Sequence, residues 1–205
     1  LPVADRVPVR GVPTGPRNFA WRANQPATLV WAEALDGGDW KVEVPARDRL
    51  LTLAAPFAGT PGEFARTKQR FGGLSWFEDG GRALLTEFDA NRNWRTTRLV
   101  DADRAGDPGR VLWDLSTHEL YANPGSPQGR VLPNGARVLR EEGGALFLNG
   151  NGASPQGDRP FLDRYDLASG QTVRLFRSDA AALERAVGFA GGDTSKLLTW
   201  HQSPA

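Results

Sequence analysis

The chain contains no cysteine and no methionine, and only two histidines, His118 and His201, among its 205 residues. The absence of cysteine excludes disulfide frameworks, thiolate catalysis and cysteine-ligated zinc, and two distant histidines make a poor zinc site. No run of about 18 apolar residues occurs, and the chain opens without a charged-then-apolar leader, so we expect a soluble protein with no membrane partner. Because Leu1 is not a start residue, we expect a piece of a longer protein.

Acidic and basic residues nearly cancel, since 24 Asp+Glu against 25 Lys+Arg give a net charge of +1. Capture of nucleic acid needs a concentrated basic face, so we expect no nucleic-acid partner. Lysine is scarce and occurs only at Lys41, Lys68 and Lys196. The resulting arginine excess fits recognition of carboxylates, and it fits genomic base composition equally well. The bias toward Ala, Gly and Arg suits a bacterial protein of the periplasm or of the cytoplasm.

Apolar residues occur in short runs bounded by Gly, Asp, Asn or Pro, as is typical of strands. With 24 Gly and 15 Pro, turns must be frequent and long helices scarce. Only Ser178 to Val187 is predicted to be helical, with Ser178 or Asp179 as its N-cap. We therefore expect an all-β chain, with strands that include 27–32, 82–88, 95–100, 109–114, 145–148 and 172–176.

Three positions recur at an interval of 55 residues and predict three similar hairpins. Each hairpin has an apolar strand end, a turn containing Asn or Asp, and a second strand; Asn and Asp tolerate left-handed backbone in such turns. A fourth copy begins at Gly188, and its Asp193 and Leu198 lie 59 residues after their counterparts. The three recurring sets are Trp21, Trp76 and Val131; Asn24, Asp79 and Asn134; and Leu29, Leu84 and Leu139.

Two outer strands are expected to complete each unit. In the first unit, Trp40 to Val44 is predicted to be a strand after the turn Asp36-Gly37-Gly38-Asp39. In the second, the loop Asp101 to Pro108 separates two strands, and in the third Ala168-Ser169-Gly170 joins two strands. Four antiparallel strands per roughly 50 residues favour a propeller over a sandwich or a helical solenoid.

The predicted fold is therefore an all-β partial β-propeller of about three and a half four-stranded antiparallel blades. A half blade leaves unpaired strand edges, so we expect other chain segments or a second copy of the chain to complete the ring. One propeller domain spans residues 1–205, with blades at about 17–70, 71–116 and 126–177 and a half blade at 186–205.

The residues for serine-hydrolase chemistry are incomplete. The motif G-x-S-x-G is absent, and Ser126 and Ser154 each precede a proline, which suits a turn and not a nucleophile elbow. His118 lies in a polar stretch beside Glu119, and His201 is four residues from the end. We therefore expect no catalytic residue in this chain.

Two acidic stretches carry part of a calcium-loop pattern. Asp89-Ala90-Asn91-Arg92-Asn93 places oxygen ligands at the first, third and fifth positions, but Trp94 replaces the required glycine and Val100 the bidentate glutamate. The stretch Asp101-Ala102-Asp103 departs from the pattern as well. We interpret both as solvated strand connections and expect no metal and no cofactor.

Three further features could suggest a ligand site. Glu141 and Glu142 would point to opposite faces of a strand and cannot act on one substrate, so we interpret them as a solvated turn before Gly143-Gly144. No helix follows Asn149-Gly150-Asn151-Gly152 to present amides to a phosphate. Bulky residues at or near the repeat positions are expected to pack in blade cores instead of forming a ligand platform: Trp21, Trp31 and Trp76.

An ordered succession of segments resembles the propeller of glutamyl endopeptidases, a branch of the prolyl oligopeptidase family of serine peptidases. Together these segments extend over nearly the whole chain. They are 17–23 (RNFAWRA), 29–31 (LVW), 36–39 (DGGD), 41–44 (KVEV), 107–108 (DP), 110–112 (RVL), 123–127 (NPGSP), 148–157 (LNGNGASPQG) and 160–163 (PFLD).

The resemblance implies a two-part enzyme in which an α/β-hydrolase domain carrying Ser, Asp and His follows the propeller. The propeller would cover the active site and admit only peptides or unfolded segments. The family's catalytic residues would lie beyond Ala205, so none is carried onto this chain. The implied partners are that hydrolase domain and peptide substrates. The alternative is a free-standing partial propeller that self-associates and acts as an interaction scaffold.

Overall fold

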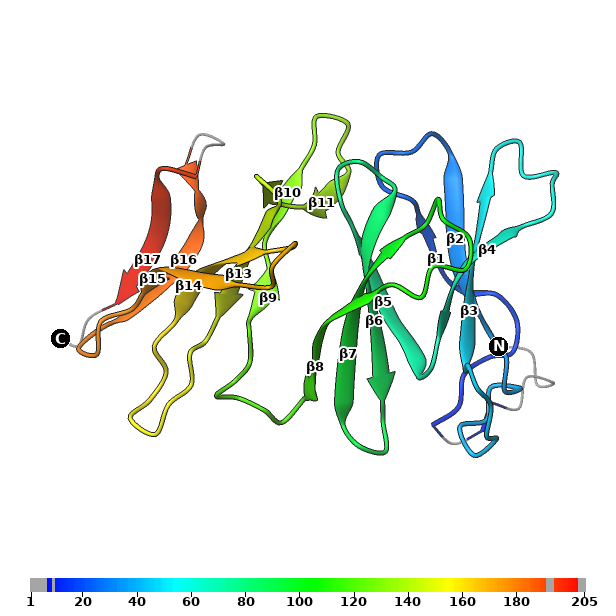
Figure 1. Cartoon of the computed structure of the whole chain (residues 1–205), viewed down its shortest axis with the longest axis horizontal. Coiled ribbons are helices and arrows are strands. Elements are labelled where there is room, and N and C mark those ends of the chain that lie inside the picture. The colour runs from blue at the N-terminus through cyan, green and yellow to red at the C-terminus, as the bar shows by residue number, and fades with distance from the viewer. Residues whose placement is uncertain (1–6, 9, 191–193, 203–205) are drawn as a thin grey trace. The chain divides into compact units, whose positions relative to one another are not determined.

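The structure, a computed structural model, describes residues 7–8, 10–190 and 194–202. Its elements β1 to β17 are all strands, and no α-helix occurs among the described residues, which confirms the all-β prediction (Figure 1). The chain divides into two compact units. The first holds the residues up to Ser116 together with Pro133–Ala136, and the second holds Thr117–Leu132 and the residues from Arg137 on.

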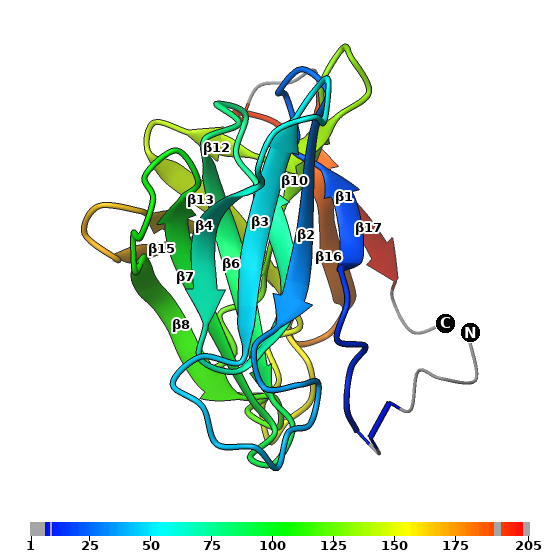
Figure 2. The ribbon, with the colours of Figure 1, turned by 90° about the vertical axis from the view of Figure 1, so that its right-hand side faces the viewer.

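The first unit contains two consecutive antiparallel sheets of four strands, in each of which the strands lie side by side in chain order. Figure 2 shows the first of these sheets in blue to cyan. Such meanders are the blades predicted from the 55-residue repeat. The first sheet is β1 (Arg17–Trp21), β2 (Thr28–Ala34), β3 (Asp48–Ala54) and β4 (Gly62–Thr67), and the second is β5 (Arg70–Trp76), β6 (Arg82–Asp89), β7 (Trp94–Asp101) and β8 (Arg110–Ser116).

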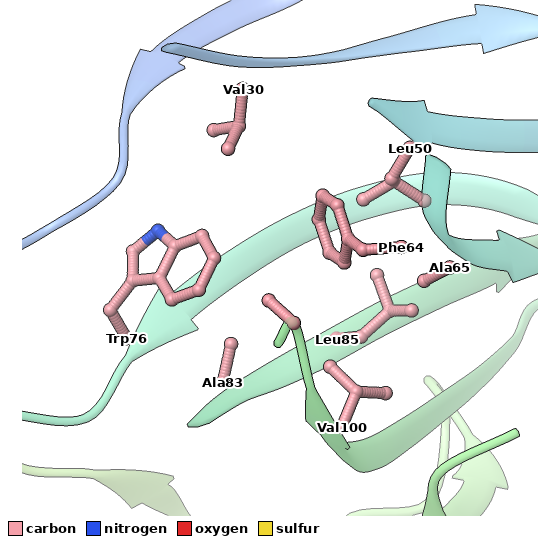
Figure 3. Packing of buried hydrophobic residues seen from close by; sticks show 9 residues of the cluster. Val30, Leu50, Phe64, Ala65, Trp76, Ala83, Leu85 and Val100 are labelled. Carbon is pink, nitrogen blue, oxygen red and sulfur yellow. The ribbon is translucent and has the colours of Figure 1, made fainter. Parts of the chain in front are cut away.

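The two sheets pack through one apolar face each, and together they form a continuous core (Figure 3). Val30 and Leu50 of the first sheet and Leu85 and Val100 of the second are at most 2% exposed. The rings of Phe64 and Trp76 join the sheets, with their centroids 6.3 Å apart. Alternation of apolar and polar residues along each strand places these side chains on the shared face.

The turns of the first two repeat hairpins lie against each other. Asn24 Nδ2 donates to the carbonyl of Glu78 at 2.5 Å, and a Cβ on Gly80 would lie 2.9 Å from the carbonyl of Ala23. Asn24 has a φ of 57°, and Gly80 and Gly135 have φ values of 70° and 81°. The left-handed turns expected from the repeat are therefore present, although glycine provides them in the second and third copies.

The second unit contains one five-stranded sheet and two hairpins. In the sheet, β13 (Ala145–Gly150), β14 (Phe161–Asp166) and β15 (Thr172–Arg177) are neighbours, and the short strands β9 (Ser126–Pro127) and β12 (Glu141–Glu142) both pair with β13. The hairpins are β10 (Gly129–Val131) with β11 (Arg137–Leu139), and β16 (Leu183–Phe189) with β17 (Leu197–Gln202).

The third repeat therefore departs from the first two. Its apolar positions, Val131 and Leu139, lie in a two-stranded sheet of their own, while β9 and β12 form the edge beside β13. Within the half blade, Leu198 lies in β17, and Asp193 falls outside the described residues.

The predicted helix at Ser178 to Val187 is wrong. Leu183–Phe189 pairs with Leu197–Gln202 as an antiparallel hairpin, because backbone pairing with β17 outweighs the helix propensity of the alanines. Ser178 caps a turn instead of a helix, since its Oγ accepts the amide of Glu184 at 2.9 Å and donates to the carbonyl of Ala182 at 2.8 Å.

The predicted strand at Trp40 to Val44 is also wrong, because this stretch lies in the connection between β2 and β3. The connection is held by side chains and not by a strand partner. Arg47 Nη1 donates to the carbonyl of Val42 at 3.2 Å, and Asp39 Oδ1 accepts the amide of Lys41 at 3.0 Å. The third strand instead begins at Asp48.

The expectation that the repeat tryptophans pack in cores holds for two of them. Trp31 and Trp76 are 7% and 6% exposed, whereas Trp21 is 62% exposed. Trp21 ends β1, an edge strand of the first sheet, and contacts the ring of Phe57 at 6.2 Å. Trp76 likewise ends an edge strand, β5, but its ring packs against Phe64 of the first sheet, which buries it.

Truncation of the shared core should destabilise the first unit. Leu85 is fully buried between the sheets, so Leu85→Ala is expected to lower the free energy of unfolding by about 2–5 kcal/mol in urea titrations. Leu120→Ala, at a side chain that is 61% exposed, is the control and should change it by less than about 0.5 kcal/mol. Equal effects of the two substitutions would contradict the packing described here.

Candidate functional site

A groove of about 630 Å³ lies in the first unit, between β4 and the β7–β8 face of the second sheet. Phe64 belongs both to the apolar core and to the groove wall, so the groove begins where the core ends. A cavity of this size is within the range of ligand sites. Its lining is Pro45, Ala46, Glu63–Gln69, Glu87, Asp89, Arg92, Trp94, Thr96, Arg98, Gly106–Pro108, Val111 and Asp114.

A buried ion pair, Glu87 with Arg98, closes the floor of the groove. Arg98 Nη2 lies 2.8 Å from Glu87 Oε1, and the same nitrogen donates to the carbonyl of Arg66 at 2.7 Å. Glu87 Oε2 accepts the amide of Gln69 at 2.8 Å. The pair therefore ties β4 and the following link to the second sheet, and it satisfies backbone groups that an edge strand would otherwise expose.

The outer wall of the groove is built around Asp114. Its Oδ1 accepts the hydroxyl of Thr96 at 2.6 Å and the indole Nε1 of Trp94 at 2.7 Å. The hydrogen bond from Thr96, with that from Trp94 and the charge of Arg92, outweighs the effect of burial and lowers the pKa of Asp114 from 3.8. Arg92 lies over the Trp94 ring, 4.7 Å from its centroid. Asp114 is therefore ionised at neutral pH and fixes the indole in place.

A second polar cluster, of two carboxylates and three arginines, joins the two sheets at the opposite end of the strands from the repeat turns. Asp48, fully buried, lies 2.6 Å from Arg17 and 2.8 Å from Arg70 and accepts the amide of Phe71 at 2.7 Å. Arg70 also reaches Asp36 at 2.5 Å, as Arg47 does at 2.8 Å. We call these five side chains the arginine–aspartate cluster: Arg17, Asp36, Arg47, Asp48 and Arg70.

Sequence reasoning missed this cluster. Arg17 and Arg70 are the first residues of β1 and β5, the opening strands of consecutive sheets, and both bind the carboxylate of Asp48. Arginine at the start of the first strand in successive units was the signal that could have found it. The cluster has a structural role, because all of its charges are paired within the fold.

Of the serines and histidines considered for catalysis, three make contacts within a strand, a turn or a hairpin. Ser126 is in β9 and pairs with Asn149, and Ser154 Oγ donates to the carbonyl of Gly157 at 2.7 Å inside its own turn. His201 Nδ1 lies 3.7 Å from a carboxylate oxygen of Glu184 across the β16–β17 hairpin. His118 is exposed in the link between β8 and β9.

The two stretches with calcium-like spacing use their carboxylates on neighbouring amides. Asp89 Oδ1 accepts the amides of Asn91 at 3.0 Å and Arg92 at 3.3 Å in the β6–β7 turn. In the β7–β8 loop, Asp101 Oδ1 accepts the amide of Asp103, whose own carboxylate lies 2.8 Å from Arg22. Among the described residues, no group of three or more His, Asp or Glu side chains is arranged to hold a metal ion.

The prediction that Glu141 and Glu142 form a solvated turn is wrong. They form the short strand β12, which pairs with β13. The turn that follows is made by Gly143 and Gly144, with φ values of 56° and 71°. Glu142 Oε1 accepts Arg140 Nη2 at 2.7 Å, so its charge is used within the fold.

The stretch Asn149-Gly150-Asn151-Gly152 ends β13 and serves packing. A Cβ on Gly152 would lie 2.0 Å from the carbonyl of Arg159, and one on Gly150 would meet the ring of Phe161 at 2.2 Å. Glycine is therefore required for close approach of neighbouring chain segments.

No family model matches the chain. Two plant proteins, each named probable glutamyl endopeptidase, chloroplastic, align with most of it. The one from Arabidopsis thaliana is 37% identical over 189 residues and the one from Oryza sativa subsp. japonica 35% identical over 188 residues; each alignment covers 87% of this chain. This chain is similar to glutamyl endopeptidases. It spans about a fifth of the length of these relatives, as each alignment covers 20% of the plant protein.

Among solved structures, an uncharacterised protein of Listeria monocytogenes EGD-e matches 93% of this chain and 51% of its own, with 10% identity and a TM-score of 0.49. TolB from Acinetobacter baumannii matches 78% of this chain and 36% of its own, with 15% identity and a TM-score of 0.38. The first two sheets are blades because each is a four-stranded antiparallel meander and the two pack face to face. No helix in the described residues is long and apolar enough to cross a membrane.

Acid should weaken the arginine–aspartate cluster at Asp36. Burial alone would raise the pKa of Asp36, but hydrogen bonds from Arg70 and Arg47, the charge of Arg70 and the Gly38 amide outweigh it and hold the pKa below 3.8. Because the folded pKa is the lower one, the stabilisation is complete above the unfolded value and is lost as pH falls through the folded value. Asp36→Asn should therefore lower the unfolding free energy by about 3 kcal/mol at pH 7, and by progressively less below pH 4.

The measurement is urea unfolding of the wild type and the variant between pH 7 and pH 2. Asp158→Asn, at an exposed carboxylate, is the control and should follow the wild type within about 0.5 kcal/mol throughout. A difference between wild type and Asp36→Asn that does not change with pH would contradict a role for the ionised carboxylate.

Proposed function

We propose that this chain is the non-catalytic propeller portion of a serine peptidase of the prolyl oligopeptidase type, resembling glutamyl endopeptidase. The proposal is carried by the alignment with the two plant proteins named probable glutamyl endopeptidase. The alignment covers 87% of this chain and 20% of each plant protein. Consecutive four-stranded antiparallel sheets in the first unit support it, since such sheets are the building blocks of a propeller.

The chemistry of peptide hydrolysis is assigned to a separate α/β-hydrolase domain of the same longer polypeptide. In this chain, the hydroxyl of Ser154 donates a hydrogen bond within its own turn, so it is not poised as a nucleophile. The chain's own contribution is to gate substrate entry and to contact the hydrolase domain. Substrates would be peptides or unfolded segments, because a rigid cover excludes folded proteins by size.

Rigidity is what a gate requires, and the first unit has the interactions that provide it. The arginine–aspartate cluster joins the two sheets through side chains that are at most 17% exposed. Glu87 and Arg98 hold β4 to the second sheet in the same way. Two sheets joined by buried ion pairs beside an apolar core cannot slide past each other without leaving charges unpaired.

A fluorophosphonate probe, which labels activated serines, tests the division of labour. The 205-residue chain should remain unlabelled, and the complete parent protein should be labelled at one serine, outside the segment that corresponds to this chain. Prior heat denaturation of the parent protein is the control and should abolish labelling. Labelling of Ser126, Ser154 or any other serine of the isolated chain would overturn the proposal.

A second candidate function is self-association as an interaction scaffold, and exposed apolar side chains on edge strands favour it. Phe19 and Trp21 on β1 are 58% and 62% exposed, and Leu198 and Trp200 on β17 are 53% and 50% exposed. Monomeric proteins rarely leave such residues together at the edge of a sheet.

If self-association occurs, sedimentation of the isolated chain should give a discrete oligomer that dissociates on dilution. Trp200→Ser should shift the equilibrium toward monomer by about tenfold or more, since a buried tryptophan is a typical interface anchor. Trp40→Ser lies outside both edge strands and is the control. A monomer at all concentrations would exclude the scaffold function.

A further inference from the structure

The chain contains three Asn-Gly pairs, and they lie in different surroundings. An asparagine followed by glycine is prone to deamidation, because a residue without a Cβ lets its amide nitrogen approach the side-chain carbonyl carbon of the asparagine. Within a folded protein, the reaction also requires that the backbone at the pair is free to rotate. The three pairs are Asn134-Gly135, Asn149-Gly150 and Asn151-Gly152.

The pair Asn134-Gly135 forms the exposed turn between β10 and β11. The amide of Gly135 donates a hydrogen bond to no described residue, and a Cβ built on Gly135 would find no other part of the chain within 4 Å. Water can therefore reach the attacking nitrogen and remove its proton. Neither residue takes part in strand pairing, so the turn can rotate without breaking a sheet.

The side chain of Asn134 lies over its own turn. Its Oδ1 accepts the amide of Ala136 at 3.0 Å, and the ring closed by this hydrogen bond contains both Asn134 Cγ and the nitrogen of Gly135. The same bond polarises the side-chain carbonyl in the sense that attack requires, since negative charge develops on the oxygen. The reacting carbon and the attacking nitrogen are therefore held within one small turn.

The pair Asn149-Gly150 is held within a sheet. Both residues belong to β13, and Asn149 is paired with Ser126 of β9 on one side and with β14 on the other. Asn149 Oδ1 accepts Gln128 Nε2 at 3.2 Å. Ring closure needs rotation of the backbone at the asparagine, which pairing on both sides prevents until the strand opens.

The pair Asn151-Gly152 is held by close packing of the backbone. The carbonyl of Gly152 accepts the amide of Arg159 at 3.0 Å, and a Cβ on Gly152 would lie 2.0 Å from the carbonyl of Arg159. Rotation at this pair would drive one chain segment into the other. The sequence Asn-Gly is thus the same at all three places, and only the first lies in an unhindered turn.

We propose that Asn134 is a site of spontaneous deamidation that reacts in the folded chain, where the other two Asn-Gly pairs are protected. Water removes the proton of the Gly135 amide, and that nitrogen forms a bond to Asn134 Cγ. The bond from Cγ to Nδ2 breaks as the amino group takes up a proton and leaves as ammonia. Water then opens the cyclic imide at either carbonyl carbon, which gives aspartate or isoaspartate. The inference rests on the turn alone and is independent of the proposed peptidase function.

The reaction removes a contact between two repeat turns within the first unit. In the unmodified chain, Asn134 Nδ2 donates to Asn24 Oδ1 at 3.3 Å, and Asn24 Nδ2 donates to the carbonyl of Glu78. Both products carry a carboxylate, which only accepts hydrogen bonds when ionised. A carboxylate cannot donate to Asn24 Oδ1, so the third repeat turn loses this bond to the first.

Peptide mapping by mass spectrometry tests the proposal on the 205-residue chain incubated at pH 8 and 37 °C. Trypsin releases Asn134 in the peptide 131–137 and leaves the other two pairs in the peptide 141–164, because Arg159 precedes a proline. Deamidation adds about 1 Da to a peptide, and fragmentation locates it within 141–164. In the folded chain, Asn134 should react about tenfold or more faster than Asn149 or Asn151, which react only when their segments open.

The same incubation in concentrated urea is the control, since all three pairs should react at similar rates once the fold is removed. In NMR spectra, the side-chain amide signal of Asn24 should shift as deamidation proceeds and should also be shifted in Asn134→Asp. Asn151→Asp is the matched variant and should leave that signal in place. No gain of mass in 131–137 from the folded chain, equal rates at the three folded pairs, or an unshifted Asn24 signal in Asn134→Asp would each overturn the proposal.

Discussion

The first unit depends on a carboxylate that water does not reach. Asp48 is fully buried at the first residue of β3, and an isolated charge in that position would strongly destabilise the fold. Arg17 of β1, Arg70 of β5 and the amide of Phe71 supply the partners. Because the donors come from both sheets, the charge can be satisfied only when the second sheet is correctly placed on the first. Specific pairing of this kind complements apolar packing, which by itself has little directionality.

The same placement creates the groove. The apolar core around Leu50, Leu85 and Val100 holds the sheets together on one side, and Glu87 with Arg98 holds β4 to the second sheet further along. The groove lies beside these contacts and is lined by residues of β4, β7 and β8, many of them polar. The groove therefore begins where the apolar residues of each strand give way to polar ones.

Much of the fold was predictable from the sequence. The 55-residue repeat indicated the first two sheets because Trp76 and Leu84 occupy positions in β5 and β6 that match Trp21 and Leu29 in β1 and β2. Prediction from local composition was wrong where the propensity of a segment competes with pairing between strands. The alanines after Ser178 favour a helix, and Trp40 to Val44 has the composition of a strand, yet neither segment has that structure. Cross-strand partners decide such cases, and a sequence read locally does not contain them.

The candidate site was much less predictable. The tryptophans and acidic stretches drew attention, but Thr67, Lys68 and Arg98 carry no motif, and only the fold places them in the lining of one groove. The sequence by itself determined the all-β class, the repeating hairpins and the similarity to glutamyl endopeptidases, because these follow from local alternation, turn residues and ordered segments. Tertiary structure alone decided which charges are paired, because hydrogen-bond partners come from strands tens of residues apart.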